Sequence, residues 1–317
     1  MKLGSLYEFV VKKGMENDPR GRRRLKEALA GKRREYNALK GKDKATFDRE
    51  CLKNPYADTR ILYGDPAVEI KTVLVGIDME APEILLTDRL NSKGEEVDLV
   101  IAHHPEGTAW AGFYDVMYMQ QDILEKFGIP LEVGKDLLKE RVGEVERAVM
   151  PANHTRSVDA ARLLDIPFMC VHTPADNHVA TYLQRLFDTK RPKRLANVLD
   201  MLKAIPEYTD AMEKKAGPRI LIGDPKKEAG RIFVDMTGGT EGSRKVFARL
   251  SQAGVGTIVA MHLDERHFKI AKGEHINVVI AGHIASDTLG LNLLFDSLVE
   301  REDLKIIPCS GFVRVKR

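Results

Sequence analysis

The sequence has few cysteines and no long apolar run, and both absences narrow the class of protein. Its only cysteines are Cys51, Cys170 and Cys309, which lie far apart. A sparse, odd set excludes a disulfide framework and is typical of a reducing compartment. No apolar run approaches the roughly 20 residues of a membrane-spanning helix, and the short apolar stretch near the N-terminus is followed by lysines, unlike a signal peptide. We therefore predict a cytoplasmic protein without membrane contact.

The net charge of +3 conceals one basic segment. Residues 12–44 contain 13 Lys or Arg and five Asp or Glu, a local charge of +8, which leaves −5 for the rest of the chain. Such a segment can meet nucleic acid or an anionic substrate. Its charges are interspersed with Glu27 and Glu35, however, and Tyr36 is its only aromatic residue. A solvated helical face is the favoured interpretation, and we do not expect a nucleic-acid partner.

The remaining composition indicates a globular α/β protein. Hydrophobic residues make up 43% of the 317 and charged residues 31%, which predicts a core large enough for one large or two ordinary domains. Apolar strands alternate with helical patterns after an initial helical segment. We predict a helical extension over 1–55, a first α/β lobe over 56–183, a helical connector over 184–217 and a second α/β lobe over 218–317.

Buried strands are predicted where short apolar runs are rich in β-branched residues. These runs are 72–79, 98–104, 167–173, 231–239, 256–262 and 277–283, with 128–134 as a further short strand. The order VLVGIDM, helix, DLVIAHH is echoed by RIFVDMT, helix, GTIVAMH, and NVVIAGH repeats the theme. Either the lobes are similar or apolar strands align by coincidence. Ligands collect at the carboxyl ends of strands in such sheets, and several of these strands end in histidine.

Two adjacent histidines, His103 and His104, follow one predicted strand and precede Pro105. Neighbouring side chains on a strand point to opposite faces, so both imidazoles reach one site only if the strand has ended and the chain bends. Pro105 is consistent with a bend because it restricts the residue before it. Two adjacent ligands serve two metal ions better than one. The alternative for each histidine is a structural residue with satisfied ring nitrogens.

Two more strand-end histidines each precede a carboxylate by four residues. Asp176 follows His172, and Asp287 follows His283. Imidazole and carboxylate ligands suit divalent ions and, without thiolates, favour an open catalytic site over a structural zinc site. A Gly-rich turn over 236–245 is either a phosphate cradle or a tight turn that needs positive φ. It lacks the Lys-Ser/Thr of a Walker A loop.

The segments YADTRILYGDPAVEIKTVLVGID, DLVIAHHP, VHTPAD and AGHIASDTLGLNLL together resemble the Ngg-interacting-factor-3-like family, whose bacterial members are often labelled GTP cyclohydrolase I type 2. The resemblance covers roughly residues 55–317 in segments. It implies a two-lobed α/β fold, a dinuclear metal centre between the lobes and toroidal homohexamers. The ligands that it implies are His103, His104, Asp176, His283 and Asp287.

The same resemblance assigns further roles. His172 opens the HTxxD motif beside the metals and is the expected catalytic residue, and His267 matches another histidine common in the family. The last ligand, usually Glu, is Asp287 here, one methylene shorter. We expect two divalent ions per chain (Zn, Fe or Mn), with Asp287 as their bridge. The function expected is hydrolysis of a small nucleotide-like or phosphate-bearing substrate, with GTP ring opening as one candidate. The alternative is a non-enzymatic metal-binding or regulatory protein that acts through protein partners.

Overall fold

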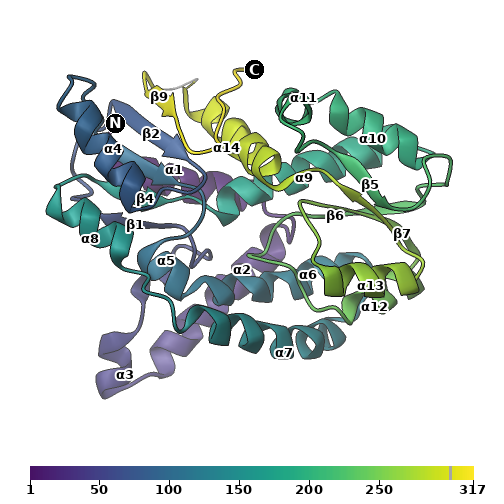
Figure 1. The fold of residues 1–317 in the computed structure, drawn as a ribbon. Coiled ribbons are helices and arrows are strands. Elements are labelled where there is room, and N and C mark those ends of the chain that lie inside the picture. The colour runs from purple at the N-terminus through teal and green to yellow at the C-terminus, as the bar shows by residue number, and fades with distance from the viewer. Residues whose placement is uncertain (300–301) are drawn as a thin grey trace.

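Two β-sheets with helices between and around them make up the protein in the computed structural model, which describes residues 1–299 and 302–317 (Figure 1). The predicted α/β class and the helical N-terminal segment are confirmed. No helix in the described part of the chain is long and apolar enough to cross a membrane.

The first sheet has the strand order β1-β4-β3-β2-β9. Its strands are β1 (Arg60–Tyr63), β2 (Thr72–Gly76), β3 (Leu99–Ala102), β4 (Phe168–Cys170) and β9 (Lys305–Pro308). β4, β3, β2 and β9 are parallel, whereas β1 is antiparallel to β4. Every residue of β2, β3 and β4 is buried, as expected of parallel strands covered on both faces.

The second sheet repeats this plan with the order β5-β8-β7-β6. Its strands are β5 (Arg219–Ile222), β6 (Arg231–Asp235), β7 (Val255–Ala260) and β8 (Asn277–Ile280). β5 is antiparallel to β8, and β8, β7 and β6 are parallel. The antiparallel strands open the repeat with RILYGDP (60–66) and RILIGDP (219–225). Gly64 and Gly223 have φ of 114° and 117°, a conformation that favours glycine.

Two long helices lie between the sheets and join the halves. α9 (Thr173–Lys190) follows β4 of the first sheet, but its Leu183 packs with Val259 of the second sheet. α14 (His283–Val299) follows β8 of the second sheet, but its Phe295 packs with Val75 of the first. α9 and α14 also pack on each other (Figure 1). At Gly290 of α14 a Cβ atom would come within 2.4 Å of the Ala175 carbonyl oxygen of α9.

Other helices pack around the two sheets. They are α4 (Ala81–Asn91), α5 (Gly107–Ala111), η2 (Phe113–Tyr118), α6 (Met119–Lys126), α7 (Leu131–Val149), α8 (Arg156–Leu163), α10 (Leu195–Lys203), α11 (Pro206–Glu213), α12 (Val246–Gln252) and α13 (Glu265–Gly273). Of these, α10 and α11 share a core with α9. The strand predicted over 128–134 is wrong. α7 starts at Leu131, directly after Pro130 as its N-cap. Its buried residues Leu138, Val142 and Val145 follow helical spacing. The seven residues 128–134 are too few to show this spacing.

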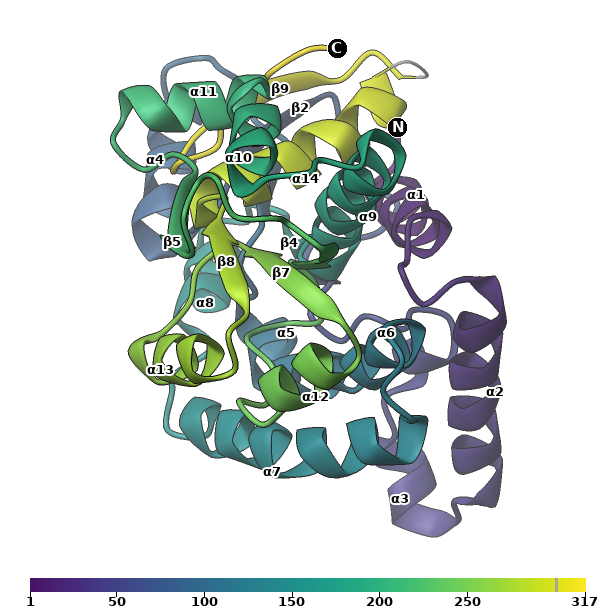
Figure 2. The ribbon, with the colours of Figure 1, turned by 90° about the vertical axis from the view of Figure 1, so that its right-hand side faces the viewer.

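The N-terminal segment consists of α1 (Leu3–Glu16), α2 (Arg22–Ala38), α3 (Gly41–Thr46) and η1 (Arg49–Leu52). α1 packs on the core of the first sheet, whereas α2 and α3 stand to one side of the body (Figure 2). The predicted domain limit at residue 184 lies within α9, and β9 adds to the first sheet. The division into lobes and connector at those limits stays a prediction.

Candidate metal centre

The six residues predicted for the site come together where the parallel strands end. β3 ends at Ala102, so His103 and His104 follow it directly, and His172 lies between β4 and α9. His283 opens α14. Asp176 lies in the first turn of α9, Asp287 lies one helical turn after His283 in α14, and both are buried.

Asp287 faces three imidazoles. Its Oδ1 lies 3.4 Å from His103 Nε2, and its Oδ2 lies 3.5 Å from His104 Nε2 and 3.6 Å from His283 Nε2. The adjacent histidines thus turn towards one carboxylate. Both Asp287 oxygens are buried without a hydrogen-bond partner among the described residues.

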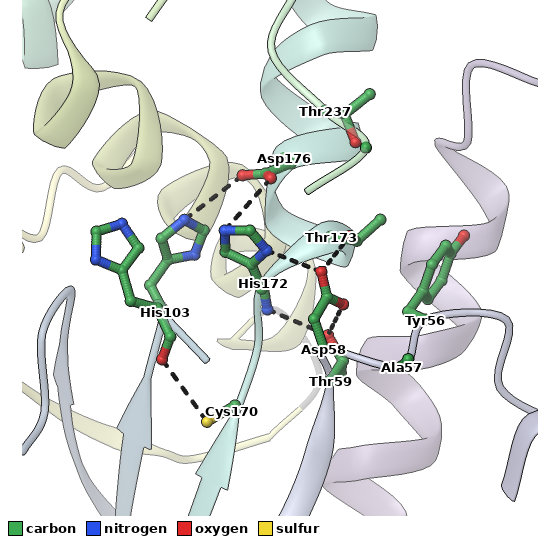
Figure 3. A network of polar contacts seen from close by, with 12 residues as sticks. Tyr56, Ala57, Asp58, Thr59, His103, Cys170, His172, Thr173, Asp176 and Thr237 are labelled. Carbon is green, nitrogen blue, oxygen red and sulfur yellow. Dashed lines mark hydrogen bonds and ion pairs between the residues drawn. The ribbon is translucent and has the colours of Figure 1, made fainter. Parts of the chain in front are cut away.

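Asp176 lies on the other side of His103. Its Oδ1 is 3.5 Å from His103 Nε2, and its Oδ2 is 3.8 Å from His172 Nε2 (Figure 3). Asp176 Oδ1 and His103 Nε2 also have no hydrogen-bond partner in the described part of the chain. Buried polar atoms without partners are costly and rare, so these four atoms need an explanation.

A pair of divalent cations fits this donor set. Two groups each have ligand atoms within 4.8 Å of one another: His103 with His104 and Asp287, and His103 with His172 and Asp176. Nitrogen and carboxylate donors match zinc, iron and manganese. A cation between the facing atoms would satisfy those that lack partners.

The outer ring nitrogens of three histidines are held in place. His103 Nδ1 donates to the Val171 carbonyl at 3.0 Å, His104 Nδ1 lies 2.6 Å from Asp78 Oδ1, and His172 Nδ1 lies 2.8 Å from Asp58 Oδ2. With Nδ1–H as donor, the lone pair of each Nε2 faces the carboxylates of the centre. Such partners orient metal-binding histidines and raise their basicity.

Sequence reasoning did not find the two supporting carboxylates. Asp58 is fully buried and also accepts a hydrogen bond from the Thr173 hydroxyl at 2.6 Å (Figure 3). Asp78 follows β2 and is more exposed. The only sequence signal was that both lie in the segment 56–78 that carried the family resemblance.

The pKa values of the two central carboxyl groups are shifted in opposite directions. Burial opposes ionisation of Asp287, but the charges of the facing imidazoles prevail and hold its pKa far below the usual range. Burial, with the nearby charge of Asp287, raises the pKa of Asp176 well above that range. Burial also acts against protonation of His104, but Asp287 and Asp78 outweigh it and raise the His104 pKa to about 10. Asp287 therefore faces a cationic His104, whereas burial and the neighbouring imidazoles lower the pKa of His283 to about 4.

A cavity of about 570 Å³ opens onto this centre and is lined by His172, Asp176, His283 and Asp287, among others. The Gly-rich turn 236–245 forms part of its wall. Gly238 and Gly239 have φ of 95° and 86°, and the Gln120 side chain donates to the carbonyls of Gly238 and Thr240. These features match the interpretation as a tight turn.

A second cluster of histidines and carboxylates lies on the wall of the cavity. His262 Nδ1 is 3.1 Å from Glu241 Oε1, and the His262 ring lies 4.8 Å from the ring of His283. His267 is placed here and not at the centre. Its Nδ1 lies 2.8 Å from Asp264 Oδ1, and its Nε2 donates to the Gly242 carbonyl at 3.0 Å. Glu241, Asp264 and His267 have the spacing of a cation site, but no buried side-chain atom of these three lacks a partner.

Comparisons with known proteins agree with this architecture. No protein-family model and no curated protein matches the sequence. The crystal structure of a NIF3 superfamily protein from Sphaerobacter thermophilus superposes with a TM-score of 0.69 at 27% identity, over 80% of this chain and 91% of that one.

Two further structures superpose less closely. Reduced HcgD from Methanocaldococcus jannaschii gives a TM-score of 0.47 at 18% identity, over 85% of this chain and 97% of that one. A Bacillus cereus protein related to NIF3 gives 0.42 at 11% identity, over 81% and 92%. The resemblance that the motifs indicated is confirmed, and the chain has the fold of the NIF3 superfamily.

Proposed function

We propose that the protein is a hydrolase that uses two divalent metal ions and acts on a small nucleotide-like or phosphate-bearing substrate. One observation carries the proposal: four buried polar atoms of His103, Asp176 and Asp287 face one another without partners. The residues that would hold the ions are His103, His104, Asp176, His283 and Asp287.

The ligands would be divided unequally between the two ions. A carboxylate has two oxygens and can span two ions, whereas a neutral imidazole offers one lone pair. Asp287 faces histidines with both oxygens, so we assign it as the bridge. An anion between them is also what two adjacent cations require. His103 and His104 would each serve one ion.

His172 is the residue that we assign to proton transfer. It lines the cavity, and Asp58 holds its Nδ1 so that Nε2 can accept and return a proton at the reacting group. The same Nε2 lies within reach of Asp176, so it can alternatively bind an ion. Metal analysis of His172→Gln separates the roles: a proton-transfer residue leaves two ions bound, whereas loss of one ion makes His172 a ligand.

Two divalent ions at such a centre supply Lewis acidity and activate water for attack. The chain contributes orientation and a wall that is partly apolar. Side chains such as Ile123, Phe247 and Leu250 line the cavity, and they would limit the access of water to a bound substrate.

The test is metal content followed by turnover. Gently purified protein should contain close to two divalent ions per chain and should hydrolyse a member of a panel of nucleotides, phosphoesters and cyclic amides, with GTP assayed first. Chelation should abolish turnover, and restored metal should recover it. A single firmly bound ion that is unaffected by His104→Ala would overturn the dinuclear centre. Two bound ions without turnover would favour the alternative, a metal-binding or regulatory protein that acts through partners.

We also propose that the chain forms a homohexamer and resides in the cytoplasm. The hexamer rests on the family resemblance, and the location is supported by three free thiols, Cys51, Cys170 and Cys309. Light scattering should give six times the chain mass of 35.5 kDa. A monomer at micromolar concentration would overturn the assembly.

A further inference from the structure

The cavity extends well beyond the metal centre, along α9. Asp176, Ala180, Gln184 and Asp188 all line it, and their spacing of four residues places them along one face of that helix. Twelve residues of α-helix span roughly 18 Å. The cavity wall therefore reaches far from the carboxylate at which the metals would bind.

β6 forms a second wall that runs antiparallel to α9. Near the metal centre, the Thr237 hydroxyl donates to Asn177 Oδ1 at 2.7 Å. Further along, the Gln184 side chain donates to the Ile232 carbonyl at 3.1 Å and accepts from the Val234 N–H at 3.0 Å. The start of β6, at Arg231, thus lies at the far end of the cavity.

Basic side chains gather at that end. Arg22, Lys126, Arg185 and Arg231 all line the cavity. The Lys126 ammonium donates to the Pro19 carbonyl, and Arg231 donates to the carbonyls of Lys126 and Phe127 at 3.0 and 3.2 Å. These contacts hold Lys126 and Arg231 beside the start of α2, where Arg22 lies.

These four cations have no carboxylate partner among the described residues, whereas neighbouring acidic groups are paired. Asp18 binds Arg20 at 2.8 Å, and Glu125 is ion-paired with Arg24. Asp188, which also lines the cavity, accepts a hydrogen bond from Gln184 and has no cation partner in the described part of the chain. The far end of the cavity therefore carries an excess of positive charge, which attracts anions.

We infer that Arg22, Lys126 and Arg231 form a subsite for a phosphate group at the end of an elongated substrate whose reacting group lies at the metal centre. This inference rests on the proposed function for the reacting end only. The subsite selects substrates by length, because a charged group must reach the basic end of the cavity while the other end meets the centre. It also gives a function to Arg22, one residue of the basic segment 12–44.

The experiment uses pyrophosphate as the probe and metal-free protein, so that the metals do not bind it. Isothermal titration should show saturable binding by the parent. The double variant Arg22→Gln, Lys126→Gln should bind at least about tenfold more weakly, the scale of one lost charge-assisted hydrogen bond. The control, Arg33→Gln with Arg34→Gln, removes the same charge from exposed positions of α2 that do not line the cavity, and it should bind like the parent.

Equal weakening in both double variants would overturn the subsite in favour of a diffuse basic surface, as would absence of saturable binding by the parent. Arg22→Gln alone guards against misfolding, since Arg22 is exposed, and it should still weaken binding. Metal content separates this inference from the proposed function: Arg22 and Lys126 variants should keep both ions, and Asp287→Ala should keep the pyrophosphate site.

Discussion

β3 and β7 occupy the same position in their sheets, yet the residues that follow them differ. β3 is followed by His103 and His104, whereas β7 is followed by Met261 and His262. His104 faces Asp287, whose two oxygens have no hydrogen-bond partner among the described residues, whereas His262 is held by Glu241. The fold thus provides two equivalent strand ends, and only the first combines two imidazoles with unpartnered carboxylates.

The helices that follow β4 and β8 extend the comparison. Each strand is followed by a histidine and, four residues later, an aspartate: His172 and Asp176, His283 and Asp287. The equivalent aspartates differ in their neighbours. Asp287 faces three imidazoles and Asp176 faces two. Residues at equivalent positions of a repeat can therefore contribute differently to one site.

The largest predicted effect is loss of bound metal, and it should differ between variants of Asp287 and Asp176. Asp287→Ala should lose both ions, because it removes the bridging group, whereas Asp176→Ala should lose only one. Metal titration followed by elemental analysis measures both, with Glu241→Gln as a control that retains two ions. Near-parent binding of two ions by Asp287→Ala would show that Asp287 is not a ligand.

The next largest predicted effect is a loss of thermal stability when metal is removed from the parent protein. Ions that bind only the folded chain stabilise it by about 2.7 kcal/mol per site at a hundred times Kd. Thermal unfolding with and without a chelator should therefore show a clear drop in Tm for the parent. Asp287→Ala should show no drop, and an equal drop in that variant would place the stabilising ions elsewhere.

A smaller effect is expected from the two supporting carboxylates. Asp58→Asn and Asp78→Asn should each weaken metal binding about 10- to 100-fold, because loss of an outer partner frees the imidazole to rotate. Competition with a coloured chelator measures the affinity. Unchanged affinity in both variants would mean that Asp58 and Asp78 only support the fold.

The smallest predicted effect is a loss of stability when the contact between Glu241 and His262 is removed. Burial opposes ionisation of Glu241, but its contact with His262 prevails and lowers the pKa of Glu241. Its charged form thus stabilises the fold above the unfolded value of about 4.3, and this contribution is lost as pH falls through the lowered folded pKa. Glu241→Gln should cost about 1 kcal/mol at pH 7. Denaturant unfolding should show the difference from the parent shrinking in acid, and a constant difference would exclude this ion pair as its source.

Much of the site could be predicted because its residues follow strands in short motifs. His103 and His104 end an apolar run, and the spacing from His172 to Asp176 fits within one helical turn. Asp58 was missed because it lies 114 residues from its partner His172, and only the fold brings β1 beside β4. His267 matched the family by motif, but its position depends on contacts with Asp264 and Gly242 that a motif does not contain.

The fold was predicted to a similar extent. Fully buried parallel strands such as β2 and β3 have an unambiguous apolar pattern. The short strands β1, β5 and β9 are only partly buried, so their patterns did not identify them. The repeated RILYGDP and RILIGDP are the sequence signal for β1 and β5, and they lie one strand before the repeat of VLVGIDM and RIFVDMT.

Gly290 lies outside the proposed ligand set, yet it fixes the spacing of the two helices that carry Asp176 and Asp287. It lies one helical turn beyond Asp287, and its missing side chain lets α14 approach the backbone of α9 next to Asp176. A methyl group there would push the helices apart and lengthen the gap between the two carboxylates. If the centre binds ions as proposed, its discrimination among ions of different radius is therefore adjustable at a residue that touches none of them.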